Sequence, residues 1–189
     1  MTQGLKTIMI DAGHGGTNPG NITTDGLMIE KHVTLDLALR LEQSLAGTPA
    51  AIVLTRDDDS SIPNDTRGEL STKYDADLVL CIHTNSWAAT AHGGLMLFYP
   101  GNKRMEALSE VIADVYPQRL RPCQVRPAYP EQYADAHYLL SQHRCDAIVV
   151  ETAFASNDSD RKMLETPWGR EQIVSALRQG VAWWLDQNL

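Results

Sequence analysis

The stretch Thr7–Gly20 reads TIMIDAGHGGTNPG and decides how the chain begins to fold. Its apolar first part predicts a strand over Thr7–Asp11, and the glycines and proline of Ala12–Gly20 predict a loop. The next segment, Lys31–Ala46, has apolar residues at a four-residue spacing along one face, which predicts a helix. A strand that passes through a Gly-rich loop into a helix is typical of an α/β fold.

The same alternation continues along the rest of the chain. Further strands are expected at Ala51–Thr55, Leu78–His83, Gly94–Tyr99 and Ala147–Val150. Helices are expected at Thr66–Tyr74, Asn102–Leu120, Ala134–His143, Asn157–Leu164 and Glu171–Leu189, and an irregular loop around Pro122, Pro127 and Pro130. Because the strands are continuously apolar, both faces of the sheet should be covered. The sequence predicts a three-layer α/β sandwich, a central mostly parallel mixed sheet with helices on both faces, in a single domain over residues 1–189.

Composition excludes several classes of protein. The 189 residues are 43% hydrophobic and 21% charged, which are values of a globular chain. Sixteen basic against 24 acidic residues give a net charge of -8, which argues against a partner that is a nucleic acid or an anionic membrane. No apolar run reaches the ~20 residues of a membrane span, so membrane insertion is not expected. We expect a monomer.

The start of the chain and its cysteines indicate a compartment. The first residues, MTQGLKT, lack the apolar stretch of a signal peptide, so we expect synthesis in the cytoplasm without export by that route. Cys81, Cys123 and Cys145 are odd in number and form no CxxC pair, which predicts free thiols in a reducing compartment. Cys145 follows a His and an Arg, but no partner that would orient it as a nucleophile is visible nearby.

Four metal-competent side chains stand near the ends of predicted elements. His14 follows the first strand, His83 ends the third, Glu151 follows AIVV, and Glu30 precedes the first long helix. In open α/β sheets the ligand crevice lies beyond the carboxyl ends of the strands. Two imidazoles and a carboxylate with one open position are typical of catalytic zinc, and a further carboxylate could serve as general base. From the residues alone, structural roles remain open as alternatives. Each His can be a hydrogen-bonded structural residue, and a Glu before a helix can be a charge that interacts with the helix dipole.

Other polar and aromatic residues have simpler interpretations. We expect surface positions for the remaining histidines, which are His32, His92, His137 and His143. The acidic run Asp57–Asp59 is interpreted as a solvated loop, with Asp57 or Arg56 tied to local backbone. Trp183 and Trp184 are adjacent and point in different directions, so at least one should lie in the core.

An ordered set of segments carries a family resemblance. The segments are IMIDAGHGG, NPG, IEKHVTLDLALRL, VLTRDDD, DADLVLCIHTN and AIVVETAFASN. From Ile8 to about Val181 they closely resemble the zinc-dependent N-acetylmuramoyl-L-alanine amidases of the amidase-3 family. The resemblance implies that His14, Glu30 and His83 bind Zn²⁺ and that Glu151 is the catalytic carboxylate. It also implies the substrate, peptidoglycan, and the bond cleaved, the amide between N-acetylmuramic acid and L-alanine.

Three further expectations follow from the resemblance. Asn85, two residues after His83, is a candidate for a hydrogen bond to the substrate or to a ligand. Ala153 stands where family members usually have Gly, so its backbone must avoid positive φ. The stretch between His83 and Glu151 is too short for the extra helix that blocks the zinc in some members, so we expect an open site.

The biological role has several alternatives. The chain is interpreted as a phage endolysin that reaches the cell wall through holin pores, with a wall-remodelling domain of a bacterial amidase as the alternative. A zinc exopeptidase would need a cationic pocket for a terminal carboxylate, for which the candidates are Arg56, Arg67, Arg126 and Arg144. A peptidoglycan-binding relative without activity would normally have lost a ligand or the base, and all four residues are present.

Overall fold

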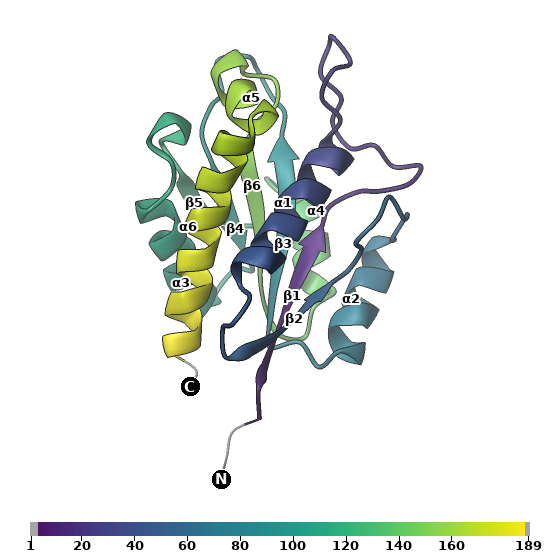
Figure 1. Ribbon diagram of the computed structural model, residues 1–189, viewed down its shortest axis with the longest axis vertical. Helices are drawn as coiled ribbons and strands as arrows, with labels where there is room; N and C mark the ends of the chain where they lie inside the picture. Colours follow the sequence, from purple (N-terminus) through teal and green to yellow (C-terminus); the bar gives the residue numbers. More distant parts are fainter. Residues whose placement is uncertain (1–3, 188–189) are drawn as a thin grey trace.

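Six strands form one sheet, in the order β2-β1-β3-β6-β4-β5, in the computed structural model, which describes residues 4–187 (Figure 1). The strands are β1 (Lys6–Ala12), β2 (Ala50–Leu54), β3 (Leu78–Asn85), β4 (Leu95–Phe98), β5 (Gln124–Pro127) and β6 (Asp146–Phe154). All neighbouring strands run parallel except β4 and β6, which are antiparallel. The prediction of a mostly parallel mixed sheet is confirmed.

Helices cover both faces of this sheet. They are α1 (Glu30–Ser44), α2 (Asn64–Lys73), α3 (Lys103–Asp114), α4 (Ala134–Ser141), α5 (Asp158–Glu165) and α6 (Pro167–Asp186), with a 3₁₀ turn, η1, at Gln118–Leu120. Residues of α1, α3, α5 and α6 belong to one core cluster, and residues of α2 and α4 pack on the other. Figure 1 shows α1 and α6 side by side in front of the sheet. The three-layer sandwich is therefore confirmed.

The two faces of β1 explain its continuous apolar sequence. Ile8 and Ile10 are fully buried in the cluster that includes α1, while Met9 is fully buried in the cluster that includes α4. Successive side chains of a strand point to opposite faces, so a strand covered on both sides needs an apolar residue at every position. The exception is Asp11, a fully buried carboxylate near the carboxyl end of β1.

The largest differences from the sequence-based prediction are at three places. The helix expected over Asn102–Leu120 ends at Asp114. The expected irregular loop contains β5, which pairs in parallel with β4 at the edge of the sheet. An edge strand tolerates Pro127, because an edge backbone needs partners on one side only. The last helix begins at Pro167, where Thr166 caps it, and the expected end at residues 188–189 lies outside the described residues.

Several predictions about single residues can be compared with the fold. Trp184 is 1% exposed, which confirms a tryptophan in the core. Asn157 caps α5, because its side chain accepts from the N–H groups of Ser159 and Asp160. The surface position expected for His143 is wrong, because its ring is buried between Ser71 Oγ at 3.1 Å and Cys81 Sγ at 3.7 Å.

The cysteines and the helices carry two smaller findings. All three cysteines are free, and burial raises the pKa of the Cys145 thiol to about 11, which disfavours the nucleophilic thiolate. Within residues 4–187, none of the helices combines the length and the apolar character that crossing a membrane requires.

Candidate metal centre

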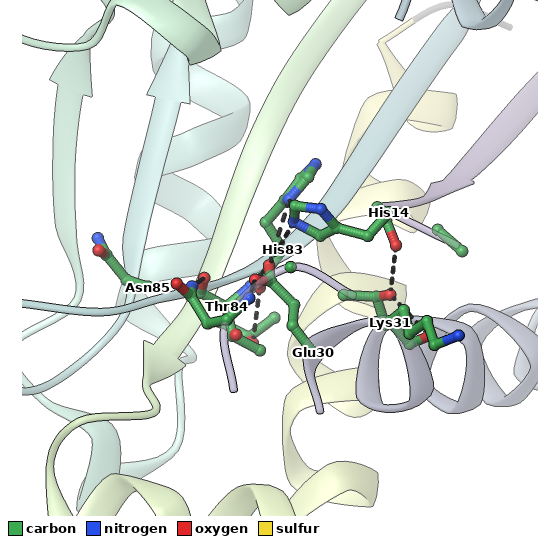
Figure 2. A network of polar contacts seen from close by, with 12 residues as sticks. His14, Glu30, Lys31, His83, Thr84 and Asn85 are labelled. Atoms are coloured by element: carbon green, nitrogen blue, oxygen red, sulfur yellow. Dashed lines mark hydrogen bonds and ion pairs between the residues drawn. The ribbon is translucent and has the colours of Figure 1, made fainter. Parts of the chain in front are cut away.

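Three of the four candidate residues bring their side chains into direct contact. His14 lies in the loop after β1, Glu30 is the first residue of α1, and His83 lies in β3. Glu30 Oε1 lies 3.1 Å from His14 Nε2 and 3.3 Å from His83 Nδ1, and the two imidazole nitrogens are 3.2 Å apart. Figure 2 shows both rings and the carboxylate pointing toward one another.

This triangle of donor atoms fits a zinc ion. Tetrahedral zinc with His and carboxylate ligands at 2.0–2.1 Å places its ligand atoms about 3.3 Å from one another. The three measured separations, 3.1, 3.2 and 3.3 Å, match that value. Two imidazole nitrogens and one carboxylate oxygen are also the donor types that zinc favours, with a fourth position left for water or substrate.

Backbone groups hold the carboxylate of Glu30 in place. Its Oε1 accepts from the N–H of Thr84 at 2.7 Å, and its Oε2 accepts from the N–H of Asn21 at 2.8 Å. Burial by itself raises the pKa of Glu30, but hydrogen bonds from His14 and His83 outweigh burial and bring that pKa well below its usual range. Glu30 therefore stays ionised, as a metal ligand must.

The ring of His14 is oriented by Asn18. His14 Nδ1 lies 3.1 Å from Asn18 Oδ1, which also accepts from the N–H of Gly20 at 3.1 Å. With Nδ1 donating to Asn18, the nitrogen left to bind a metal ion is Nε2, on the side of Glu30 and His83, once the ion displaces the proton that Nε2 shares with Glu30. Sequence reasoning missed Asn18, although the Asn-Pro-Gly turn that contains it was visible.

Two glycines lie so close to the candidate ligands that a side chain would collide with them. A side chain at Gly13 would collide with the ring of His83. A Cβ at Gly20 would lie 2.6 Å from both Glu30 Oε2 and His14 Cδ2, and the φ of Gly20 is +67°. His14 itself has a φ of +60°, a region that side chains rarely adopt. Ala153 is not among the described residues with positive φ, as expected.

Glu151 lies beside the triangle, on the neighbouring strand. It is the register partner of His83 across β3 and β6, and its Oε2 is buried with no hydrogen-bond partner within the described part of the chain. Burial raises the pKa of Glu151 to about 7, the charge of His83 opposes this, and the charge of Glu30 adds to it. A carboxyl group with a pKa near neutrality can both accept and return a proton.

All four residues line one open cleft of about 760 Å³. One wall is formed by the start of α2, including Asn64 and Asp65, and another by α4, including Asp135 and Tyr138. Within the described residues between His83 and Glu151, α4 borders the cleft without filling it, so the expected open site agrees with the fold. Asn85 also lines the cleft, and its Oδ1 accepts from the N–H of Ser86 at 2.8 Å.

The four arginines considered for a carboxylate pocket are placed differently. Arg67 lines the cleft, and its guanidinium donates to Asp11 and to the carbonyls of Ile62, Ala12 and His14. Arg56 is 4% exposed and donates to the carbonyl of Asp58, which confirms its expected tie to local backbone. Arg126 and Arg144 are not among the residues that line this cleft.

Comparison with known proteins gives the same family over nearly the whole chain. The profile of the N-acetylmuramoyl-L-alanine amidase family matches residues 8–182. The germination-specific N-acetylmuramoyl-L-alanine amidase of Bacillus subtilis is 26% identical over 93% of this chain and 78% of its own length. The amidase LytC of the same organism is 27% identical over 93% of this chain, which spans only 34% of that relative.

Solved structures share the fold. An N-acetylmuramoyl-L-alanine amidase from Clostridium difficile 630 has a TM-score of 0.85 at 23% identity. The match covers 97% of this chain and 98% of that one. The CwlD amidase from Clostridioides difficile, solved in complex with the GerS lipoprotein, has a TM-score of 0.82 at 25% identity, with 96% of this chain and 99% of that chain covered.

Proposed function

The chain belongs to the N-acetylmuramoyl-L-alanine amidase family, and on that premise we propose that it cleaves the amide between N-acetylmuramic acid and L-alanine with a zinc ion held by His14, Glu30 and His83. The observation that supports this most directly is the triangle of donor atoms, which has the dimensions of a zinc site and opens into the cleft. Peptidoglycan is the substrate, and the cleft offers room for a muramyl peptide.

The remaining chemistry belongs to side chains of the chain itself. A zinc ion held by His14, Glu30 and His83 would polarise the scissile carbonyl and acidify the attacking water. Glu151 takes the proton of that water and returns it to the leaving amine of L-alanine, a role that suits a carboxyl group with a pKa near 7. Asn18 keeps His14 in the tautomer that presents Nε2. In this proposal Asn85, which lines the cleft, makes a hydrogen bond to the substrate or to one of the metal ligands.

The exopeptidase alternative is disfavoured by the arginines. The only one of the four candidates among the residues lining the cleft, Arg67, is 2% exposed and bonded to three backbone carbonyls and to Asp11. A guanidinium engaged in this way has little capacity to bind a terminal carboxylate. The binding-module alternative is disfavoured because both the metal triangle and Glu151 are intact.

The reaction is tested by digesting purified, sugar-intact peptidoglycan with and without a chelator, followed by mass spectrometry. We expect free stem peptides with a new N-terminal L-alanine, lost on chelation and restored by zinc. Cuts inside the stem peptide would favour the exopeptidase, and an intact wall would favour the binding module.

The role of Glu151 is tested by E151Q, with E171Q on α6 as the matched control. We expect E151Q to keep one bound zinc and to lose roughly 10²–10⁴-fold in kcat, the usual contribution of general acid–base catalysis. E171Q should match the parent protein in both measurements. Unchanged lysis by E151Q would contradict the assignment of Glu151.

The cellular role is a separate proposal. The endolysin role predicted from the sequence and the bacterial wall-remodelling role use the same reaction, and the two relatives from Bacillus subtilis support the second. Isolated sacculi separate the two: a lysin clears their turbidity completely, whereas a remodelling enzyme releases a limited share of stem peptides. We further propose that residues 1–189 act as one monomeric domain, and the molecular mass from sedimentation equilibrium tests this.

A further inference from the structure

Two buried arginines surround the loop that carries His14. We propose that Arg56 and Arg67 are positioning residues that hold His14 and Glu30 in the geometry of the metal site before the metal arrives. The inference rests on the proposed function, because it assumes that His14 and Glu30 bind the ion.

Three successive backbone carbonyls of the loop accept hydrogen bonds from these two side chains. The carbonyl of Ala12 accepts from Arg56 Nε at 3.0 Å and from Arg67 Nη1 at 2.9 Å. The carbonyl of Gly13 accepts from Arg56 Nη2 at 2.8 Å, and that of His14 accepts from Arg67 Nη2 at 2.8 Å. The two peptide groups before His14 and the one after it are therefore each fixed by a guanidinium.

Arg56 also connects this loop to the start of α1. Its Nη2 donates to the carbonyl of Lys31 at 2.9 Å and to Thr34 Oγ1 at 3.1 Å, and Thr34 Oγ1 in turn donates to the carbonyl of Gly13 at 2.7 Å. Lys31 directly follows Glu30 in the sequence. The guanidinium of Arg56 thus links Gly13, which precedes His14, to Lys31, which follows Glu30.

Arg67 fixes the loop from the opposite side. It extends from α2, pairs with the fully buried Asp11, and donates through Nε to the carbonyl of Ile62 at 3.0 Å. Asp11 Oδ1 also accepts from Thr55 Oγ1 at 2.6 Å. The carboxylate of Asp11 therefore fixes the position of the Arg67 guanidinium, which in turn bonds the carbonyls of the loop.

The backbone conformation of His14 explains why these contacts are needed. A non-glycine residue at positive φ is strained, and His14 adopts a φ of +60°. Such a conformation persists only when its surroundings determine it. The planar fork of a guanidinium bonds several carbonyls in one fixed geometry, which the single ammonium of a lysine cannot do.

The test is zinc affinity in R56K, measured on the full chain by competition with a chromophoric chelator. Residues that orient metal ligands typically contribute 10–100-fold to metal affinity, so we expect the zinc dissociation constant to rise by about that factor. The visible spectrum of the Co²⁺-substituted protein should change as well, because the ligand geometry changes. The unfolding midpoint of the metal-free protein is measured in parallel.

R170K is the matched control. Arg170 is also an arginine that bonds a backbone carbonyl, that of Leu164, and a carboxylate, that of Asp36, but it lies on α6 away from the loop. R170K should lose stability while keeping the zinc affinity and the Co²⁺ spectrum of the parent protein. If R56K does not fold, T34V removes one hydrogen bond to Gly13 with little change of shape and should weaken zinc binding several-fold, whereas T34S should restore it.

The outcomes separate this inference from the proposed function. If the parent protein binds zinc tightly and R56K and T34V bind it within twofold with an unchanged Co²⁺ spectrum, the arginines are merely structural and the inference is overturned. If the parent protein binds zinc and R56K binds it weakly while intact peptidoglycan is never cleaved, the inference holds and the proposed reaction fails. A parent protein that binds no zinc overturns both.

Discussion

Gly20 shows at the scale of a single residue how closely the site is packed. Its positive φ and its closeness to His14 and Glu30 predict two separate effects of G20A. The left-handed backbone should lower the unfolding free energy by about 1–2 kcal/mol. The new methyl group should displace Glu30 or His14, so zinc affinity should fall by at least tenfold. Chemical denaturation and chelator competition measure the two effects.

G26A separates these effects. Gly26 has a φ of +70°, and a side chain there would meet nothing within 4 Å. G26A should therefore show the backbone cost of about 1–2 kcal/mol alone, no more than G20A loses, and keep the zinc affinity of the parent protein. Equal zinc affinity in G20A and G26A would contradict the packing argument.

The raised pKa of Glu151 predicts a pH dependence in the metal-free protein. The folded state holds the proton up to about pH 7, whereas an unfolded glutamate releases it near 4.5. Between these values the folded state binds more protons, so its stability falls as the pH rises. The unfolding free energy of the parent protein, measured against E151Q, should fall by up to about 3 kcal/mol over this interval. A difference that is flat from pH 4.5 to 7 would contradict the assigned pKa.

At this scale the sequence predicts which candidate side chains meet better than it predicts the residues that support them. His14, Glu30, His83 and Glu151 stand next to strand and helix ends, and this position alone brings them to one edge of the sheet. Arg56 and Arg67 gave no comparable signal, because an arginine in a polar loop or short helix usually faces water. Only the fold shows that both point inward at the carbonyls of the loop.

Among the elements, α5 connects helix capping to the border of the cleft. Asn157 Oδ1 caps α5, and its Nδ2 donates to the carbonyl of Ala89 at 2.8 Å in the loop between β3 and β4. N157A should lower the unfolding free energy by about 1 kcal/mol and speed amide hydrogen exchange in residues 86–93. N102A removes the cap of α3, so it should cost similar stability and leave that exchange unchanged. Equal exchange in both variants would contradict the connection.

Prediction of elements succeeded where packing on both faces demands a continuous apolar sequence. β1, β3 and β6 lie in the interior of the sheet and were found, although β3 and β6 extend beyond the predicted ends. β5 was missed because a four-residue edge strand of alternating exposure, ending in proline, resembles a loop. The antiparallel pairing of β4 with β6 also leaves no signal in the sequence of β4, because it depends on contacts between segments far apart in the chain.

The charge of the whole molecule affects how it meets its substrate. A net charge of -8 repels walls that carry anionic polymers. Salt shortens the Debye length to ≈ 10 Å at 0.1 M, so kcat/KM on such walls should rise with ionic strength, on the order of several-fold from low salt to 0.15 M. A small uncharged muramyl peptide should show no such rise. A rate on walls that falls with salt would indicate attraction through a local basic surface.

The place of β6 in the sheet has a consequence for synthesis on the ribosome. β6 lies between β3 and β4, although both of these strands precede it in the chain. A nascent chain that has not yet reached Asp146 contains His14, Glu30 and His83 but has an interrupted sheet and no Glu151. Long-range strand pairing of this kind forms late. We therefore expect a nascent or prematurely terminated chain that lacks β6 to be unable to cleave peptidoglycan.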